Sequence, residues 1–243
     1  MPYRRLPNTD SARFKALKQV YHKGKEIPPF KLAFSQSSFQ KVISFLPTFE
    51  KMMLRQREAF NNQIKRNSEF HEQMKKAKLY ISHFIQVVNM AIQRGELPLS
   101  IREYYHLTRC GSKFPPLNTE DDILLWGNNL IEGETSRIRE GLPPITNPTV
   151  AVVKVRYEKF LEAYENKKNL QMTTNRALKE LADLRPQADE IILNVWNEVE
   201  ESFKDLPDNL KREKAAEYGL VYIYRKNEIP EQNLFNQARL GIS

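Results

Sequence analysis

Prolines separate the amphipathic helices of this 243-residue chain, and the same order of helices and prolines occurs twice. This repetition limits the possible folds more than any single motif does. A shift of 108 positions aligns residues 49–51 with residues 157–159, and one inserted residue then brings Leu97-Pro98 onto Leu206-Pro207. The double prolines at 28–29 and 143–144 also correspond. Amphipathic helices align easily by chance, but matched prolines in the same order argue against chance. The sequence therefore predicts two related units.

Each unit has the pattern of a short helix, a double proline, a long helix, a second helix, Leu-Pro and a final short helix. In the first unit we expect helices from residue 35 to about 75 and from 79 to 94, and in the second unit we expect a break at Pro186. One helical hairpin cannot bury its apolar stripe alone, whereas two hairpins can bury theirs against each other. The predicted fold is an all-α, pseudo-twofold helical bundle of two duplicated long-helix hairpin units with short capping helices.

We divide the chain into a basic N-terminal arm with a short helix (1–27), a first helical repeat (28–113) and a second helical repeat (114–243). The repeats are expected to share one core and to form one compact domain. Residues 220–224 are the best strand candidate, because β-branched and aromatic residues follow a glycine there. The shift also matches Asn89 with Asn197, and we expect this structural pair to hydrogen-bond across the axis and fix register.

The net charge of +8 is distributed unevenly between the two halves of the chain. Residues 1–113 hold 21 basic and 8 acidic residues, a net charge of +13, whereas residues 114–243 have a net charge of −5. The first 27 residues alone carry +5. A solvated helix face is one explanation for such clusters, and an anionic partner is the other. The candidate partner or anion-binding residues are Arg4, Arg5, Arg13, Lys15, Lys18, Lys23 and Lys25.

These features predict a non-enzymatic helical scaffold or interaction protein that belongs to a larger assembly and docks through its basic N-terminal half. Its partner is a protein with an acidic surface, or a second copy associating through complementary charge. The alternative is a nucleic-acid-binding protein, because the arm mixes basic residues with Tyr3, Phe14 and Tyr21. The chain contains no helix-turn-helix, zinc-finger or RNP signature, so such binding would be independent of base sequence and strongly salt-dependent.

A search for enzymatic chemistry finds no convincing site. The single cysteine, Cys110, excludes an internal disulfide and a cysteine-based zinc cluster, and eight glycines leave little material for phosphate-binding loops. The four histidines do not recur between the repeats. Glu132 and Glu134 could act as an acid–base pair beside Arg137, but they are equally compatible with ordinary helix ion pairs such as Glu134–Arg137. We therefore predict no catalytic residue, no metal, no cofactor and no small-molecule substrate.

No stretch of about 18 apolar residues is present, and the polar N-terminal sequence has no apolar signal region. The sequence thus predicts a cytoplasmic protein without a membrane-spanning segment.

Overall fold

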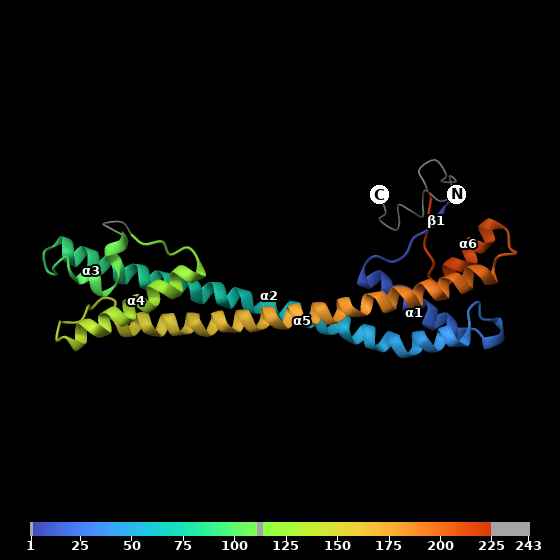
Figure 1. The fold of residues 1–243 in the computed structure, drawn as a ribbon, viewed down its shortest axis with the longest axis horizontal. Helices are drawn as coiled ribbons and strands as arrows, with labels where there is room; N and C mark the ends of the chain where they lie inside the picture. The colour runs from blue at the N-terminus through green and yellow to red at the C-terminus, as the bar shows by residue number, and fades with distance from the viewer. Residues whose placement is uncertain (1, 111–113, 225–243) are drawn as a thin grey trace. The chain divides into compact units, whose positions relative to one another are not determined.

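The computed structural model describes residues 2–110 and 114–224 and confirms an all-α protein with one small two-stranded ribbon (Figure 1). Within this part of the chain, no helix has the length and apolar character needed to cross a membrane. The helices are α1 (Asp10–Glu26), η1 (Pro29–Lys31), α2 (Gln36–Gln93), α3 (Ile101–Tyr104), η2 (Leu107–Cys110), α4 (Glu120–Arg139), α5 (Val150–Ser202) and α6 (Asp208–Glu217). The strands are β1 (Tyr3–Arg4) and β2 (Tyr222–Ile223).

Helices α2 and α5 are continuous over 58 and 53 residues, so the breaks predicted at residues 75–79 and at Pro186 are wrong. Pro47 also lies inside a helix, because α2 begins at Gln36. Both prolines are exposed, so each lies on the solvent side of its helix, where water can replace the helical hydrogen bond that a proline removes. The apolar stripe of each helix continues on the opposite side. Each half of the chain therefore contributes one long helix instead of the expected pair.

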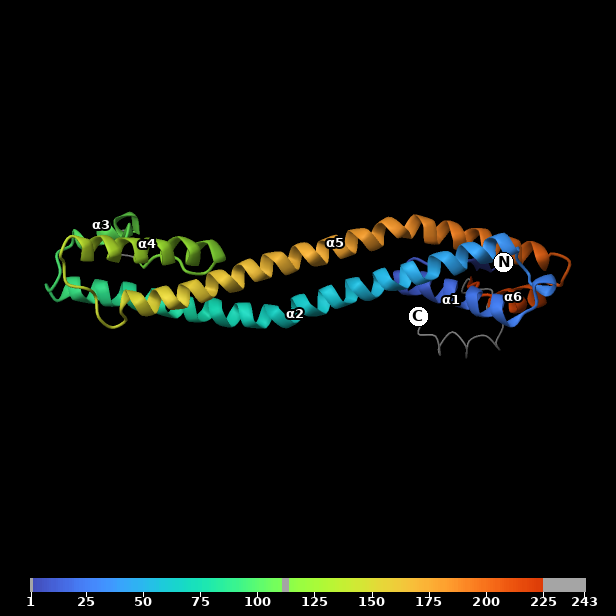
Figure 2. The same ribbon diagram turned by 90° about the horizontal axis from the view of Figure 1, so that it is seen from below.

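The chain divides into two compact units. Unit 1 contains residues 1–58 and 175–243, and unit 2 contains residues 59–174. Within each unit, a stretch of α2 lies beside an antiparallel stretch of α5 (Figures 1 and 2). These units differ from the repeats predicted from sequence. The predicted boundary at residue 113 lies outside the described residues, and the domain division stays a prediction.

The core of unit 1 is formed where α1 and the end of α6 pack against α2 and α5. Its fully buried side chains include Leu17 of α1, Phe49 of α2 and Trp196 of α5. At the start of α2, Glu198 of α5 accepts hydrogen bonds from the Ser35 amide (2.5 Å) and the Ser38 hydroxyl (2.6 Å). Burial alone would raise the pKa of Glu198, but these hydrogen bonds outweigh it and lower the pKa.

The core of unit 2 contains the second half of α2, helices α3 and α4, and the first half of α5. Gly127 and Gly133 allow α4 to approach its neighbours closely. A Cβ atom on Gly127 would lie 2.3 Å from the Tyr157 ring, and one on Gly133 would lie 2.3 Å from the Tyr104 carbonyl oxygen. These contacts explain why α4 contains glycines in its interior despite their low helix propensity.

The strand predicted within residues 220–224 is present as β2. It pairs antiparallel with β1, so that Tyr3 lies opposite Ile223 and Arg4 lies opposite Tyr222. The Arg5 amide also donates to the Val221 carbonyl at 2.8 Å. The first residues of the predicted arm are therefore held against the core of unit 1.

Candidate docking surface

Helix α1 carries most of the predicted partner-binding residues, and the contacts of its buried side hold it in unit 1. Thr9 caps the helix by accepting a hydrogen bond from the Ala12 amide at 3.2 Å. The stripe formed by Ala16, Leu17 and Val20 is buried in the core of unit 1. Gly24 lies in the last turn of the helix. A Cβ atom there would lie 2.2 Å from the Phe39 ring, so the glycine permits close packing of α1 on α2.

Two bidentate ion pairs fasten the start of α1 to α5. Arg13 donates from Nε and Nη2 to the two carboxylate oxygens of Asp189, at 2.7 and 3.0 Å. Reciprocally, Arg185 donates to both oxygens of Asp10, at 2.8 Å each. The Arg13 side chain is only 12% exposed. Its charge is therefore engaged within the fold and is not available to a partner.

Two more of the predicted cations also form ion pairs within the fold. Lys23 binds Glu217 at the end of α6 at 2.9 Å, and this hydrogen bond raises the pKa of Lys23. Arg4 binds Glu200 of α5 at 2.8 Å, and Glu200 also accepts a 2.6 Å hydrogen bond from the Tyr222 hydroxyl. Of the seven residues predicted to bind a partner, Arg4, Arg13 and Lys23 are half-buried and ion-paired.

The remaining cations of α1 lie on its solvent side. Lys15, Lys18 and Lys25 are exposed, and none of them forms an ion pair with a carboxylate in the described part of the chain. The Lys18 ammonium lies 5.6 Å from the centre of the Phe14 ring, and the Lys25 ammonium lies 4.6 Å from that of Tyr21. Arg5, just before the helix, is exposed as well.

Five of the six exposed positions of α1 form one row at intervals of four and three residues, and we call this row the α1 outer face; the sixth, Glu26, is the last residue of the helix. It consists of Ser11, Lys15, Lys18, His22 and Lys25. Residues at these intervals lie on the same side of a helix. A shallow groove of about 310 Å³ runs along this face. The groove is lined by Lys15, Lys18, Gln19, His22, Lys23, Glu26 and Glu217.

Helix α4 offers an internal comparison for this face. Thr119 caps α4 as Thr9 caps α1, by accepting a hydrogen bond from the amide three residues later, here that of Asp122. The residues of α4 at the same distances from the cap are exposed too, and we call them the α4 outer face. They are Asp121, Leu125, Asn128, Glu132 and Thr135. This face carries two acidic residues and no basic residue, so a helix capped and packed in this way does not need lysines on its outer side.

The predicted structural pair is divided between the two units. Asn89 lies in unit 2 with its Oδ1 atom buried and without a hydrogen-bond partner, whereas Asn197 is exposed in unit 1. Asn197 lines a shallow pocket near the start of α2. Their proposed role in fixing register stays a prediction.

A buried charged cluster in unit 2 links α3, α4 and the loop before α5. Glu134 and Arg137 are both 0% exposed and form a 2.6 Å ion pair, as the structural interpretation of this sequence predicted. The Tyr105 hydroxyl donates to Glu134 and accepts from Arg137 at 2.9 Å. The Ile145 amide donates to Glu134 at 2.6 Å, and Arg137 donates to the Pro143 carbonyl at 3.2 Å.

This cluster has a structural role. Glu132 is exposed whereas Glu134 is buried, so the two carboxylates do not form a pair. Burial and the hydrogen bond to Glu134 raise the pKa of Tyr105, which keeps its phenol protonated. The sequence indicated the Glu134–Arg137 spacing, but Tyr105 could not be linked to it because that residue lies 29 positions away from Glu134.

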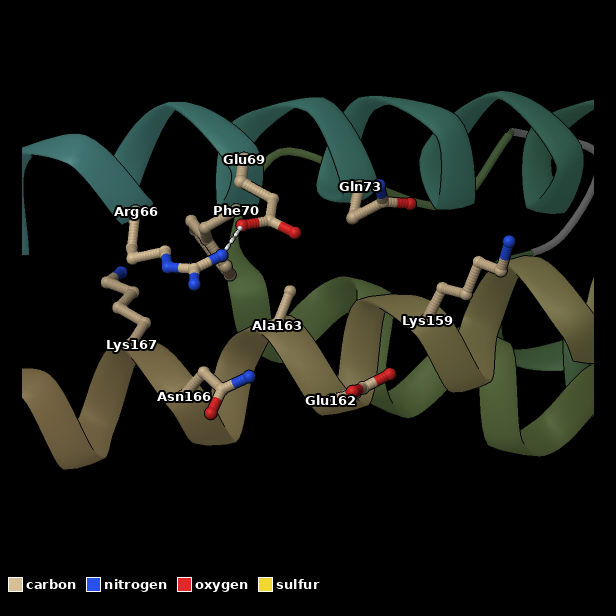
Figure 3. A pocket seen from close by; sticks show the side chains of 9 residues that line it. All are labelled: Arg66, Glu69, Phe70, Gln73, Lys159, Glu162, Ala163, Asn166 and Lys167. Carbon is tan, nitrogen blue, oxygen red and sulfur yellow. Dashed lines mark hydrogen bonds and ion pairs between the residues drawn. The ribbon is translucent and has the colours of Figure 1, made fainter.

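A second pocket, of about 250 Å³, lies between α2 and α5 in unit 2 (Figure 3). Two of its three cations have partners within the fold, whereas Lys159 and Glu162 form no ion pair in the described part of the chain. Arg66 binds Glu69 at 2.8 Å, and Lys167 pairs with Glu120 while its ammonium lies 4.4 Å from the centre of the Phe70 ring. It offers one cation without a carboxylate partner in the described residues, Lys159, against three on the α1 outer face, so it is the weaker candidate for binding an anion.

The described residues contain no group of three or more histidine, cysteine or acidic side chains arranged to hold a metal ion. All four histidines are exposed and lie apart from one another in the chain, in α1, in α2 and after α3.

No protein-family model matches this sequence, and neither a curated protein nor a solved structure is significantly similar to it. The function proposed below therefore rests on the residues of this chain.

Proposed function

We propose that this chain is a non-enzymatic helical scaffold or interaction protein that docks on an acidic protein surface through the α1 outer face. One observation carries the proposal: three exposed lysines stand in a row without carboxylate partners, while the other cations of the same helix form ion pairs within the fold. Lys15 and Lys18 are three positions apart, and like charges at that spacing repel by roughly 0.2–0.5 kcal/mol. An acidic partner would relieve that repulsion.

The comparison with α4 supports this assignment. The two outer faces have the same exposed positions relative to their caps, yet only α1 presents lysines there. A face that merely needed to be soluble could be as mixed as that of α4. The basic character of the α1 outer face is therefore better explained by a partner than by the needs of the fold.

An acidic protein fits this face better than a nucleic acid does. Phe14 and Tyr21 are half-buried, and the Lys18 and Lys25 ammoniums lie close to their rings, so these aromatic rings are poorly available for base stacking. Glu26 and Glu217 also line the groove, where a continuous phosphate backbone would meet their carboxylates. An acidic protein can place separate carboxylates opposite the lysines.

Photo-crosslinking in the native cell tests the proposal directly. A benzoylphenylalanine placed at His22 should capture a partner, and the triple variant Lys15→Glu, Lys18→Glu, Lys25→Glu should lose that partner by at least about tenfold. The matched control reverses three exposed lysines elsewhere, Lys65, Lys75 and Lys179. Equal capture by the triple variant and by the wild type would refute docking through this face.

Gel mobility shifts with DNA and RNA distinguish nucleic-acid binding from docking on an acidic protein. A shift at low salt that the α1 triple variant abolishes and the control variant retains would replace the acidic protein by a nucleic acid. Absence of a shift at low salt would exclude the nucleic-acid function.

We also propose that the chain is an internal duplication with pseudo-twofold symmetry, in which α1, α2 and α3 correspond to α4, α5 and α6. The buried positions support this. Phe45 and Phe49 of α2 correspond to Val153 and Tyr157 of α5 at an offset of 108. Further along, the offset becomes 107, and the buried pairs are Ile81 with Ala188, Ile85 with Ile192 and Val88 with Val195. At this offset Asn89 corresponds to Trp196 and not to Asn197.

The composition of the units agrees with this correspondence. Unit 1 contains α1, the start of α2, the end of α5, and α6. If each of these helices is replaced by its counterpart in the other repeat, the set becomes α4, the start of α5, the end of α2, and α3. These are the helices of unit 2. In an experimental structure, the rotation that places α1–α3 on α4–α6 should also place α4–α6 on α1–α3. Two unrelated rotations would refute the symmetry.

A further inference from the structure

The proposed docking function does not identify the acidic partner, and this chain itself has an acidic surface that fits the α1 outer face. Along α5, Glu158, Glu162 and Glu165 are exposed at intervals of four and three residues, and we call them the α5 acidic row. Glu162 and Glu165 form no ion pair in the described part of the chain, and Glu158 has only a long contact of 3.9 Å with Lys154. This row repels itself, as the lysines of α1 do.

The spacings of the two rows are complementary in sign and in length. Residues 158, 162 and 165 span seven positions, which is about 10 Å along a helix at 1.5 Å per residue. Lys18, His22 and Lys25 repeat this spacing in one direction, and His22, Lys18 and Lys15 repeat it in the other. In either orientation, every carboxylate of the row therefore meets a lysine or an imidazole N–H group.

We propose that a second copy of this chain is an occupant of the α1 outer face, with its α5 acidic row laid against the lysines. This inference rests on the docking function proposed above. The contact is heterologous, because it joins different surfaces of the two copies, so each copy keeps one free surface of each kind. Association extends beyond dimers unless the copies close into a ring.

The contact is mainly electrostatic, and this determines its strength. Exposed ion pairs contribute little individually, so the association is weak and appears at low salt and high protein concentration. The screening length falls from about 10 Å at 0.1 M salt to about 3 Å at 1 M, so high salt should dissociate the copies.

Sedimentation velocity of the full chain tests the proposal. At low salt, the average mass of the wild type should rise with concentration, and 0.5 M NaCl should return it to that of the monomer. The basic-face variant (Lys15, Lys18 and Lys25 to Glu) and the acidic-row variant (Glu158, Glu162 and Glu165 to Lys) should each weaken association by about tenfold or more. The control variant (Lys65, Lys75 and Lys179 to Glu) should associate as the wild type does.

Mixing the two variants gives the decisive result. Each should be monomeric alone with an unchanged circular dichroism spectrum, and the mixture should associate, because each variant supplies the face that complements its partner. A monomeric wild type at low salt, or a monomeric mixture, would overturn self-association. Loss of the crosslinked partner in the basic-face variant would still support docking on a different acidic protein, so the two proposals fail separately.

Discussion

Removing the buried cation Arg137 should destabilise unit 2 more than any surface substitution. Arg137→Met leaves the Glu134 carboxylate at 0% exposure with only two donors, the Tyr105 hydroxyl and the Ile145 amide. The Pro143 carbonyl also loses its donor. Breaking a buried ion pair by removing one partner costs about 3–5 kcal/mol, because the other charge stays buried without compensation. We expect a loss in this range in the free energy of unfolding.

A double-mutant cycle separates this pair from the rest of the core. Glu134→Gln alone should cost about 2–4 kcal/mol, since it leaves the guanidinium unpaired. The double variant should cost at least about 2 kcal/mol less than the sum of the two single variants, because neither charge then remains. Arg139→Met is the matched control, since Arg139 is exposed in the same helix, and should change stability by less than about 0.5 kcal/mol.

Urea unfolding followed by the fluorescence of Trp126 is the appropriate assay, with Trp196 replaced by Phe. Trp126 is buried in the core of unit 2 and Trp196 in that of unit 1, so the remaining signal reports on unit 2. A loss below about 1 kcal/mol for Arg137→Met, or additive single effects, would refute the reasoning from buried charge.

Four further predictions follow from individual contacts. Burial raises the pKa of Tyr105, so the protonated phenol contributes to the stability of unit 2 below pH 10, and this contribution is lost at higher pH. The free energy of unfolding should therefore fall less steeply with rising pH in Tyr105→Phe than in the wild type. Identical pH profiles would contradict this. Gly133→Ala should lower the free energy of unfolding in urea by about 1–3 kcal/mol, because the new Cβ atom meets the Tyr104 carbonyl oxygen. The control Gly141→Ala, at φ +82° in open space, should lower it by only about 1 kcal/mol. Equal losses would exclude the clash. The pKa of Glu198 is lowered, so its carboxylate stabilises unit 1 above pH 4.5 and loses this effect as the pH falls. In Glu198→Gln, the free energy of unfolding should therefore depend less on pH in the acid range. An unchanged dependence would contradict this. Pro186→Ala should raise the thermal midpoint, with a gain of up to about 3 kcal/mol, because proline is an unfavourable residue inside a helix and this one is exposed. A lower midpoint would show that the helix needs the proline.

The helical content and the caps were predictable because they depend on neighbouring residues. Thr9 and Thr119 each precede an acidic first turn, a local pattern that favours an N-cap, and both cap their helices. The break predicted at Pro186 was wrong because the effect of a proline depends on which side of the helix faces water, and Pro47 likewise lies inside a continuous helix. That side was already readable in the apolar pattern: Val42, Phe45 and Phe49 place residue 47 on the opposite, solvent side.

The candidate site was only partly predictable, because the ion pairs that remove cations from the surface are distant in sequence. Arg13 meets Asp189, and Arg4 meets Glu200, across separations of 176 and 196 residues. Residue type alone does not separate these arginines from Lys15 or Lys18. For Arg13 the helical period does, since Lys15 and Lys18 lie opposite the buried stripe of α1 and Arg13 lies beside it.

The outer faces of α1 and α4 bring these observations together. The inner side of a helix is constrained by the core, as the buried stripe of α1 and the close contacts of Gly127 and Gly133 illustrate. The outer side is constrained only by solubility unless something binds there. A row of unpaired lysines makes a small unfavourable contribution to the isolated helix, and the α4 outer face shows that an equivalent position can do without them. The lysines of α1 are therefore best explained by carboxylates that lie outside the molecule, and the α5 acidic row of a second copy supplies carboxylates at the required spacing.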